Sequence, residues 1–87
     1  MLVGLVVGRV VATRKDEKLV GSKLLIVKPY GSAAGPGDGL IVAVDTVGAG
    51  VGEEVLVATG SAARLASDLD GKPVDAAIVG IVDSKEV

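Results

Sequence analysis

Residues 43–57 read AVDTVGAGVGEEVLV, in which an apolar run enters a glycine-rich turn and a second apolar run leaves it. Gly48, Gly50 and Gly52 accept turn conformations that other residues avoid, and they would also let a backbone approach a phosphate closely. A phosphate site of this kind needs a helix N-terminus after the turn, whereas the residues that follow here are β-branched and favour a strand. We therefore interpret this stretch as a tight turn that joins two strands.

Five stretches of the chain have the length and apolar content of strands: residues 2–13, 22–30, 40–45, 54–59 and 73–83. The first and the last are apolar on both faces, as the adjacent pair Val6-Val7 illustrates, so both of their faces are expected to be buried. Helices would cover the second face in a parallel α/β protein, but no helical period of useful length is present. A neighbouring subunit is the remaining candidate for that cover.

The best helical pattern is short and covers residues 61–69. Ser61 is the expected N-cap, and Leu65 and Leu69 are spaced i, i+4 on one face. The charge run at 14–18 is expected to be a connecting loop. The small, polar segment at 31–39 is expected to be a surface hairpin loop and is a candidate partner contact.

Five short strands with one short helix between the fourth and the fifth predict an all-β fold, a small five-stranded OB-like β-barrel formed by one domain over residues 1–87. The helix lies one strand later than is usual for an OB fold. Of the 87 residues, 49% are hydrophobic and a single one is aromatic. Because a domain of this size buries about 60% of its unfolded surface, part of this aliphatic surface must lie where another subunit covers it.

The composition argues against an enzyme and against a metal site. The chain contains no cysteine and no histidine, which removes thiolate ligands, disulfides and the commonest general base. Ser61 has the position of a nucleophile at a strand-to-helix turn, but no base lies at a recognisable spacing and the N-cap role is favoured. Arg64 could bind an anion, although a pair with a carboxylate such as Asp45 or Asp75, in this subunit or the next, is favoured. We expect no catalytic residue, cofactor or metal.

Nucleic acids and membranes are poor partners for this chain. OB-type modules bind single strands through a basic groove and stacked aromatic side chains, whereas this chain has a net charge of −2 and Tyr30 as its one aromatic residue. The apolar N-terminal run lacks a preceding basic region, and Arg9 interrupts it before it could span a bilayer. We expect a cytosolic protein, and a single-stranded nucleic-acid-binding OB module is kept as the alternative function.

Five motifs in this order carry a resemblance to a known family. They are GRVVAT at 8–13, LVGSKLL at 19–25, AVDTVGAG at 43–50 followed by Gly52-Glu53, GSAAR at 60–64, and PVDA at 73–76 with GIVD at 80–83. Nearly end to end, the chain resembles the vertex-protein family of bacterial microcompartments, the EutN/CcmL family. The resemblance implies a five-stranded OB-like barrel that assembles into a homopentamer. Such a pentamer caps the vertices of a polyhedral shell, of a carboxysome or a metabolosome, whose facets are tiled by hexameric shell proteins.

The resemblance also implies a place for the glycine turn and for the polar segment after the fourth strand. Both would lie at the inner seam or pore of the pentamer, where five copies crowd together and small side chains are needed. The residues expected there are Asp45, Gly48, Ala49, Gly50, Gly60, Ser61 and Arg64. In that setting, valine at position 48 or 50 should disrupt the ring more than the barrel.

Overall fold

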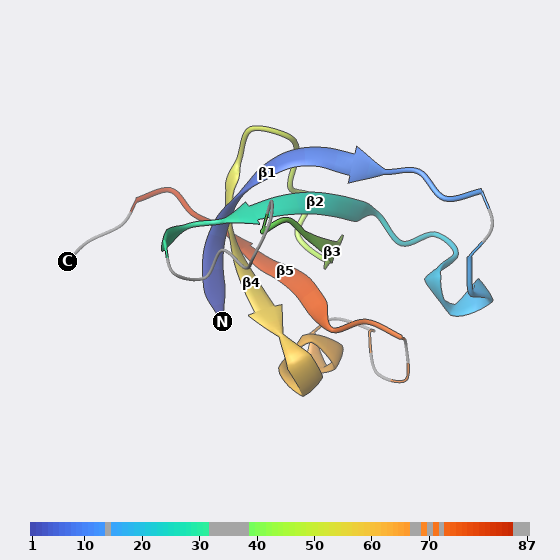
Figure 1. Cartoon of the computed structure of the whole chain (residues 1–87). Coiled ribbons are helices and arrows are strands. Elements are labelled where there is room, and N and C mark those ends of the chain that lie inside the picture. Colours follow the sequence, from blue (N-terminus) through green and yellow to red (C-terminus); the bar gives the residue numbers. More distant parts are fainter. Residues whose placement is uncertain (14, 32–38, 67–68, 70, 72, 85–87) are drawn as a thin grey trace.

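Five strands close on themselves into a barrel in the computed structural model, which describes residues 1–13, 15–31, 39–66, 69, 71 and 73–84 (Figure 1). The strands are β1 (Leu2–Val10), β2 (Leu24–Pro29), β3 (Ile41–Asp45), β4 (Glu54–Thr59) and β5 (Ala76–Ile81). Their order around the barrel is β1-β2-β3-β5-β4, and β4 pairs back with β1. Only the β3–β5 pair is parallel within this barrel. The predicted OB-like barrel of five strands is confirmed.

Three strands are shorter than predicted: β2 covers Leu24–Pro29 rather than residues 22–30, and β1 and β5 are limited by the ends of their partners. β1 stops at Val10, which pairs with Leu24, the first residue of β2, so the chain after Val10 has no strand beside it. Val11 accordingly is 81% exposed. β5 begins at Ala76 rather than at residue 73, and its first partner is Thr59, the last residue of β4. The strands predicted at 40–45 and 54–59 match β3 and β4 to within one residue.

The first strand is covered on only one face within the chain. A β-bulge at Val7 interrupts the pairing of β1 with β2, since Val6 pairs with Val27 while Gly8 pairs with Ile26. Val6 is 1% exposed and Val7 is 41% exposed. The second face of this strand is therefore exposed in the single chain, and its cover by a neighbouring subunit stays a prediction.

The connection between β4 and β5 contains a 3₁₀ helix, η3 (Gly60–Leu65), at the place predicted for the helix. Two details of the prediction are wrong. The N-cap is Thr59 rather than Ser61, because the Gly60 N–H donates to the Asp75 carbonyl at 2.8 Å and the helix starts one residue earlier. Leu65 is 83% exposed while Leu69 is buried, because η3 ends at Leu65 and Leu69 lies beyond it, so the two leucines do not share one helical face.

The remaining loops are described only in part. The predicted loop at 14–18 contains the start of a short 3₁₀ turn, η1 (Glu17–Leu19), whose N-cap Asp16 accepts a hydrogen bond from the Lys18 N–H at 2.8 Å. Of the predicted surface loop at 31–39, residues 32–38 lie outside the described residues. No helix in the described parts of the chain has both the length and the apolar character needed to cross a membrane.

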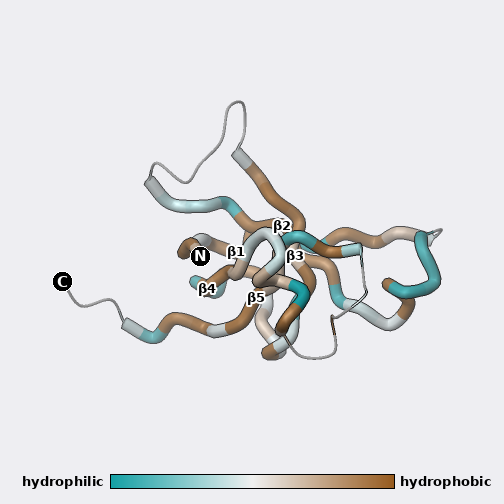
Figure 2. Tube along the Cα trace, turned by 90° about the horizontal axis from the view of Figure 1, so that it is seen from below, coloured by the Kyte–Doolittle hydropathy of each residue, from teal (hydrophilic) through white to brown (hydrophobic). Residues whose placement is uncertain are grey.

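Buried side chains form two clusters on the two sides of the barrel wall. The barrel interior is filled by small and medium aliphatic residues: Val6, Leu25, Val27, Ala43, Ala49, Val55, Val57, Ala76 and Ile78. The second cluster packs η3 against the outside of β3 and β5: Val44, Ala63, Leu69, Val74 and Ala77. Hydrophobic residues accordingly dominate the strands in Figure 2, with hydrophilic residues at their ends and in the loops. Aliphatic packing thus holds η3 in place.

Gly4 in β1 is expected to be essential to the barrel, because no side chain fits there. A Cβ at this position would lie 2.6 Å from Val27 Cγ1 and 2.8 Å from the Lys28 carbonyl oxygen. We expect Gly4→Ala to destabilise the fold by about 1–3 kcal/mol through overpacking, measured by urea unfolding. Gly8→Ala is the control, since its Cβ would meet Ile26 Cδ1 at an ordinary 3.5 Å. Equal losses for the two variants would contradict this account.

Candidate functional site

The seven predicted site residues belong to two segments at opposite ends of β4. The first segment is the end of β3 with the glycine loop, which we define as residues 46–53; the second is η3. In Figure 1 the glycine loop lies at the top of the barrel and η3 at the bottom. A strand of six residues spans about 20 Å, so one chain does not bring the two segments together. A seam that contains both would have to form between copies.

A lysine outside the predicted set holds the glycine loop. Lys23, which directly precedes β2, has its Nζ 3.6 Å from Asp45 Oδ2 and donates a hydrogen bond to the Ala49 carbonyl. The Asp45 side chain is 3% exposed, and its Oδ1 accepts from the Val47 N–H at 3.1 Å. Lys23 therefore links the first residue of the turn to its middle. The sequence had suggested Arg64 as a partner of Asp45. Within the chain, Asp45 instead pairs with Lys23.

Further bonds fix the loop to the neighbouring strands. Thr46 Oγ1 donates to the Ile78 carbonyl of β5 at 2.7 Å, and the Gly52 N–H donates to the Val6 carbonyl of β1 at 2.9 Å. Between these two points, Ala49 is fully buried in the barrel core. The loop is thus held at both ends and at its centre. Its outward side chains are Val47 and Val51, which are 40% and 60% exposed.

The glycines of the loop serve different purposes. Gly48 and Gly52 have φ angles of 79° and 93°, a region that side chains with a Cβ avoid. Gly50 has no such backbone, and a Cβ there would meet only Glu53 Oε1, at 3.6 Å. The Gly50 N–H donates to that same oxygen at 2.8 Å. Neither backbone conformation nor packing within the chain requires glycine at position 50, and its place at a subunit seam stays a prediction.

The η3 segment is tied to the chain that enters β5. Arg64 Nη1 donates to the Val74 carbonyl at 3.1 Å, so its partner within the chain is a backbone oxygen, and a carboxylate of the next subunit stays a prediction. Ala63 is fully buried beneath it, whereas Ser61 is exposed. No group of three or more metal-ligating side chains occurs among the described residues. These contacts orient η3 but arrange no reactive groups.

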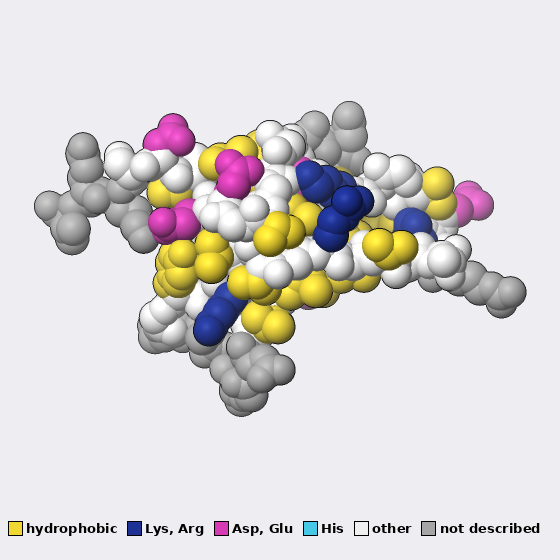
Figure 3. All heavy atoms as spheres, turned by 90° about the horizontal axis from the view of Figure 1, so that it is seen from above, with side chains coloured by type: hydrophobic (Ala, Val, Ile, Leu, Met, Phe, Trp, Pro, Cys, Tyr) yellow, Lys and Arg dark blue, Asp and Glu magenta, His cyan; other side chains and the backbone are white. Residues whose placement is uncertain are grey.

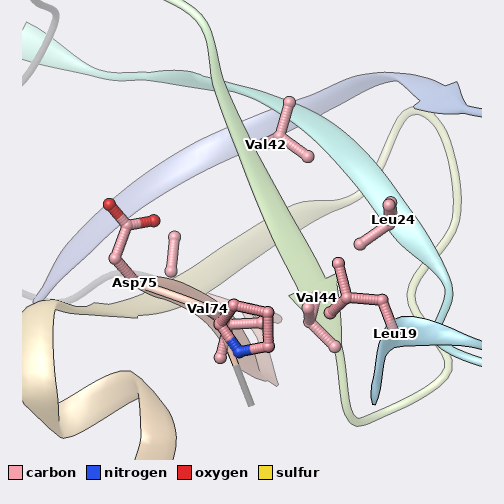
Figure 4. A pocket seen from close by; sticks show the side chains of 8 residues that line it. Leu19, Leu24, Val42, Val44, Val74 and Asp75 are labelled. Carbon is pink, nitrogen blue, oxygen red and sulfur yellow. The ribbon is translucent and has the colours of Figure 1, made fainter. Parts of the chain in front are cut away.

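Two adjoining hollows lie where β3 and β5 diverge, and the sequence did not indicate them. The first, of about 220 Å³, is lined by Leu19, Leu24, Val42, Val44, Pro73, Val74, Asp75 and Ala76 (Figure 4). The second, of about 440 Å³, is lined by Leu2, Ile41, Val42, Thr59, Gly60, Asp75 and Ala76. They share three residues and form one groove, which we name the β3–β5 groove. The opening exists because β3 pairs with β5 only through Val44–Ala77 and Asp45–Ile78.

Fold and site together define a class: a small OB-like barrel whose surface features are a rigid glycine loop, an apolar groove and exposed aliphatic side chains. The family model described as "Ethanolamine utilisation protein EutN/carboxysome" matches residues 1–83. The chain belongs to this EutN/CcmL family.

Relatives with curated names and solved structures agree with this assignment. The chain is 49% identical over 86 residues to the bacterial microcompartment shell vertex protein GrpN of Rhodospirillum rubrum, covering 99% of this chain and 97% of the relative. The structure described as the GrpN pentameric microcompartment shell protein from Rhodospirillum rubrum superposes with a TM-score of 0.82 at 47% identity, covering 100% and 98% of the two chains. The structure of Gloeobacter violaceus CcmL gives a TM-score of 0.88 at 41% identity, with 100% and 90% covered.

Asp45 should contribute to stability through the contacts that hold the glycine loop. We expect Asp45→Ala to lower the free energy of unfolding by about 1–3 kcal/mol, because the Val47 amide loses its acceptor and Lys23 loses its counter-charge. Urea unfolding of the protein in its monomeric form measures this loss. Lys28→Met, at an exposed lysine within β2, is the control and should change stability little. A loss no larger than that of the control would show that the loop does not depend on this carboxylate.

Proposed function

We propose that this chain is a structural, non-catalytic shell protein whose homopentamers cap the vertices of a polyhedral bacterial microcompartment. The observation that carries the proposal is the 49% identity, over nearly the full length of both chains, to a relative named as a microcompartment shell vertex protein. A structural neighbour at 47% identity that is described as pentameric supports the fivefold state. In this proposal residues 1–87 act as one vertex domain.

The proposed mechanism is geometric. A flat layer of hexameric shell proteins cannot close into a polyhedron, and a fivefold unit at each vertex introduces the missing curvature. The partners are four further copies of this chain and the surrounding hexamers, and the function needs no cofactor, nucleic acid or membrane. A ring of five forms through a heterologous contact, in which one surface of a subunit meets a different surface of the next.

The exposed aliphatic side chains support assembly. Val7 on β1, Val42 on β3 and Val51 in the glycine loop are 41%, 50% and 60% exposed. Apolar surface of this kind, spread over several strands of a small domain, favours contact with other protein subunits. Burying it between copies would supply the favourable free energy that holds the ring together.

The alternative function, single-stranded nucleic-acid binding, has less support. Among the described residues, the β3–β5 groove is lined mainly by aliphatic side chains, and its charged lining residue is Asp75. A groove that follows a phosphate backbone needs cations and stacking aromatic side chains instead. A mobility shift at low salt, where such binding is strongest, would favour this alternative.

Mass measurement tests the proposed assembly. Native mass spectrometry or sedimentation should give a species with the mass of five copies of the 8.6 kDa chain. A monomer, dimer or hexamer under native conditions would contradict the proposal. In cells, deletion of the gene should give elongated or leaky compartments that the wild-type gene restores. Normal, closed shells in the absence of any substitute vertex protein would refute the functional assignment.

Gly50 allows the seam to be tested apart from the barrel. We expect Gly50→Val to lower the pentamer fraction while monomer stability changes little, because the added Cβ has room within the chain. Gly48→Val should impair both, since a β-branched residue is strained at a φ of 79°. Gly21→Ala is the control for backbone strain outside the glycine loop, with a φ of 85° and nothing near the added Cβ. If the Gly50→Val variant assembles fully into pentamers, Gly50 does not lie at the seam.

A further inference from the structure

Lys23 meets the glycine loop because of its place beside the β2–β3 ladder. Leu24 pairs with Val44 in antiparallel register, and one step further along the chain the Asp45 N–H donates to the Lys23 carbonyl at 2.9 Å. Lys23 and Asp45 therefore lie directly across from each other, a position in which opposite charges on neighbouring strands stabilise the pairing. The register of β2 and β3 thus places an amino group at the start of the loop.

The Lys23 amino group links the start of the loop to its centre. Its Nζ lies 3.6 Å from Asp45 Oδ2 and donates a hydrogen bond to the Ala49 carbonyl. The Asp45 side chain is 3% exposed, and Ala49 is fully buried in the barrel core. Removal of the amine would leave a buried carboxylate without this counter-charge and a carbonyl without this donor, and both losses are unfavourable.

The two ends of the loop are fixed by other contacts. Thr46 Oγ1 donates to the Ile78 carbonyl at 2.7 Å, and the Gly52 N–H donates to the Val6 carbonyl at 2.9 Å. These bonds do not involve Lys23 and attach the loop to β5 and β1. Loss of the Lys23 amine would therefore loosen the centre of the loop, residues 47–51, while its attachment to the barrel stays intact.

The centre of the loop carries the side chains that can meet another subunit. Val47 and Val51 are 40% and 60% exposed, and Gly48 between them has wide backbone freedom unless neighbouring contacts restrict it. Figure 3 shows the molecule from above, the side on which the loop lies in Figure 1, and hydrophobic side chains are exposed there beside Lys and Arg. A loop that has to become ordered on binding weakens the contact, because only the ordered fraction of the chains can bind.

We propose that Lys23 is a positioning residue for the pentamer: its amino group holds the glycine loop in the conformation that packs against the neighbouring subunit. This inference rests on the proposed pentamer and on a place for the loop at its seam. Lys23 acts through the loop, because Asp45 and Ala49 engage its amino group within its own chain. If one tenth of the loops stay ordered without the amine, the apparent dissociation constant of each contact rises about tenfold.

Lys23→Met tests this role, because methionine keeps much of the aliphatic side chain and removes the amine. The concentration at which half of the chains are pentameric should rise about tenfold or more, measured by native mass spectrometry over a dilution series. A fixed, low concentration of urea makes the natural pentamer dissociate measurably in this series. Lys28→Met removes the same charge from an exposed site on β2, and this matched control should change the concentration less than about twofold.

A second variant separates the loop from the stability of the barrel. Lys23→Met combined with Asp45→Asn removes the buried charge together with its partner, while the asparagine oxygen can still accept from the Val47 N–H. Stability in urea should return toward the natural value, whereas assembly should stay weak because Ala49 still lacks its link to Lys23. Recovery of assembly together with stability would overturn the proposal, since the amine would then serve only to neutralise the carboxylate.

Hydrogen–deuterium exchange tests whether the loop is held as inferred. In the monomeric protein, Lys23→Met should speed exchange in a peptide that covers residues 46–51 by about tenfold and leave the β4 peptide, residues 54–59, unchanged. Unchanged exchange in residues 46–51 would show that Lys23 does not order the loop. Faster exchange with natural assembly would show that the order of the loop does not matter to the pentamer. Either result overturns the proposal.

The outcomes separate this inference from the proposed function. Absence of any pentamer in the natural chain refutes the proposed function itself. A natural pentamer that Lys23→Met forms equally well refutes the inference alone. A loss of assembly that is confined to low salt also overturns it, because salt screens an exposed pair between Lys23 and a partner's carboxylate far more than a partly buried pair within the chain.

Discussion

The chain between β3 and β4 is held in one shape by the Lys23 amino group together with hydrogen bonds to β1 and β5. Lys23 Nζ reaches both the Asp45 carboxylate and the Ala49 carbonyl, and this draws the turn inward until Ala49 fills part of the barrel core. Without these contacts, the glycine-rich segment would have wide backbone freedom, since glycine restricts φ and ψ least. The burial of Ala49 in the barrel core and the shape of the loop therefore depend on the same contacts.

A rigid loop and an open groove have opposite physical origins in this barrel. The loop is rigid because hydrogen bonds to β1 and β5 fix it from both sides. The groove is open because the parallel β3–β5 pairing consists of two residue pairs, and β3 and β5 separate beyond these pairs. Each feature leaves aliphatic side chains exposed, and the part of the chain that the structure describes contains no group of three or more potential metal ligands. A surface of this composition is suited to packing against protein subunits.

Several sequence expectations failed for reasons that local patterns do not contain. Ser61 is a good N-cap residue, but the hydrogen bond from Gly60 to Asp75 starts the helix one residue earlier. Leu65 and Leu69 have α-helical spacing, yet the 3₁₀ helix ends at Leu65, and Leu69 lies beyond it in the buried cluster that contains Val44 and Ala77. In each case a contact with a distant part of the chain decided between local alternatives.

The amino-acid order was sufficient for the fold class, the five strands and the membership of a family, because strand length, apolar content and glycine turns are local properties. It was also sufficient to indicate that the aliphatic content exceeds what so small a core can bury. The tertiary structure was needed to show that Lys23, and not Arg64, pairs with Asp45, and that the glycine loop and η3 lie at opposite ends of β4. Both facts depend on which strands become neighbours when the barrel closes, and residues that meet in this way are separated by tens of positions in the chain.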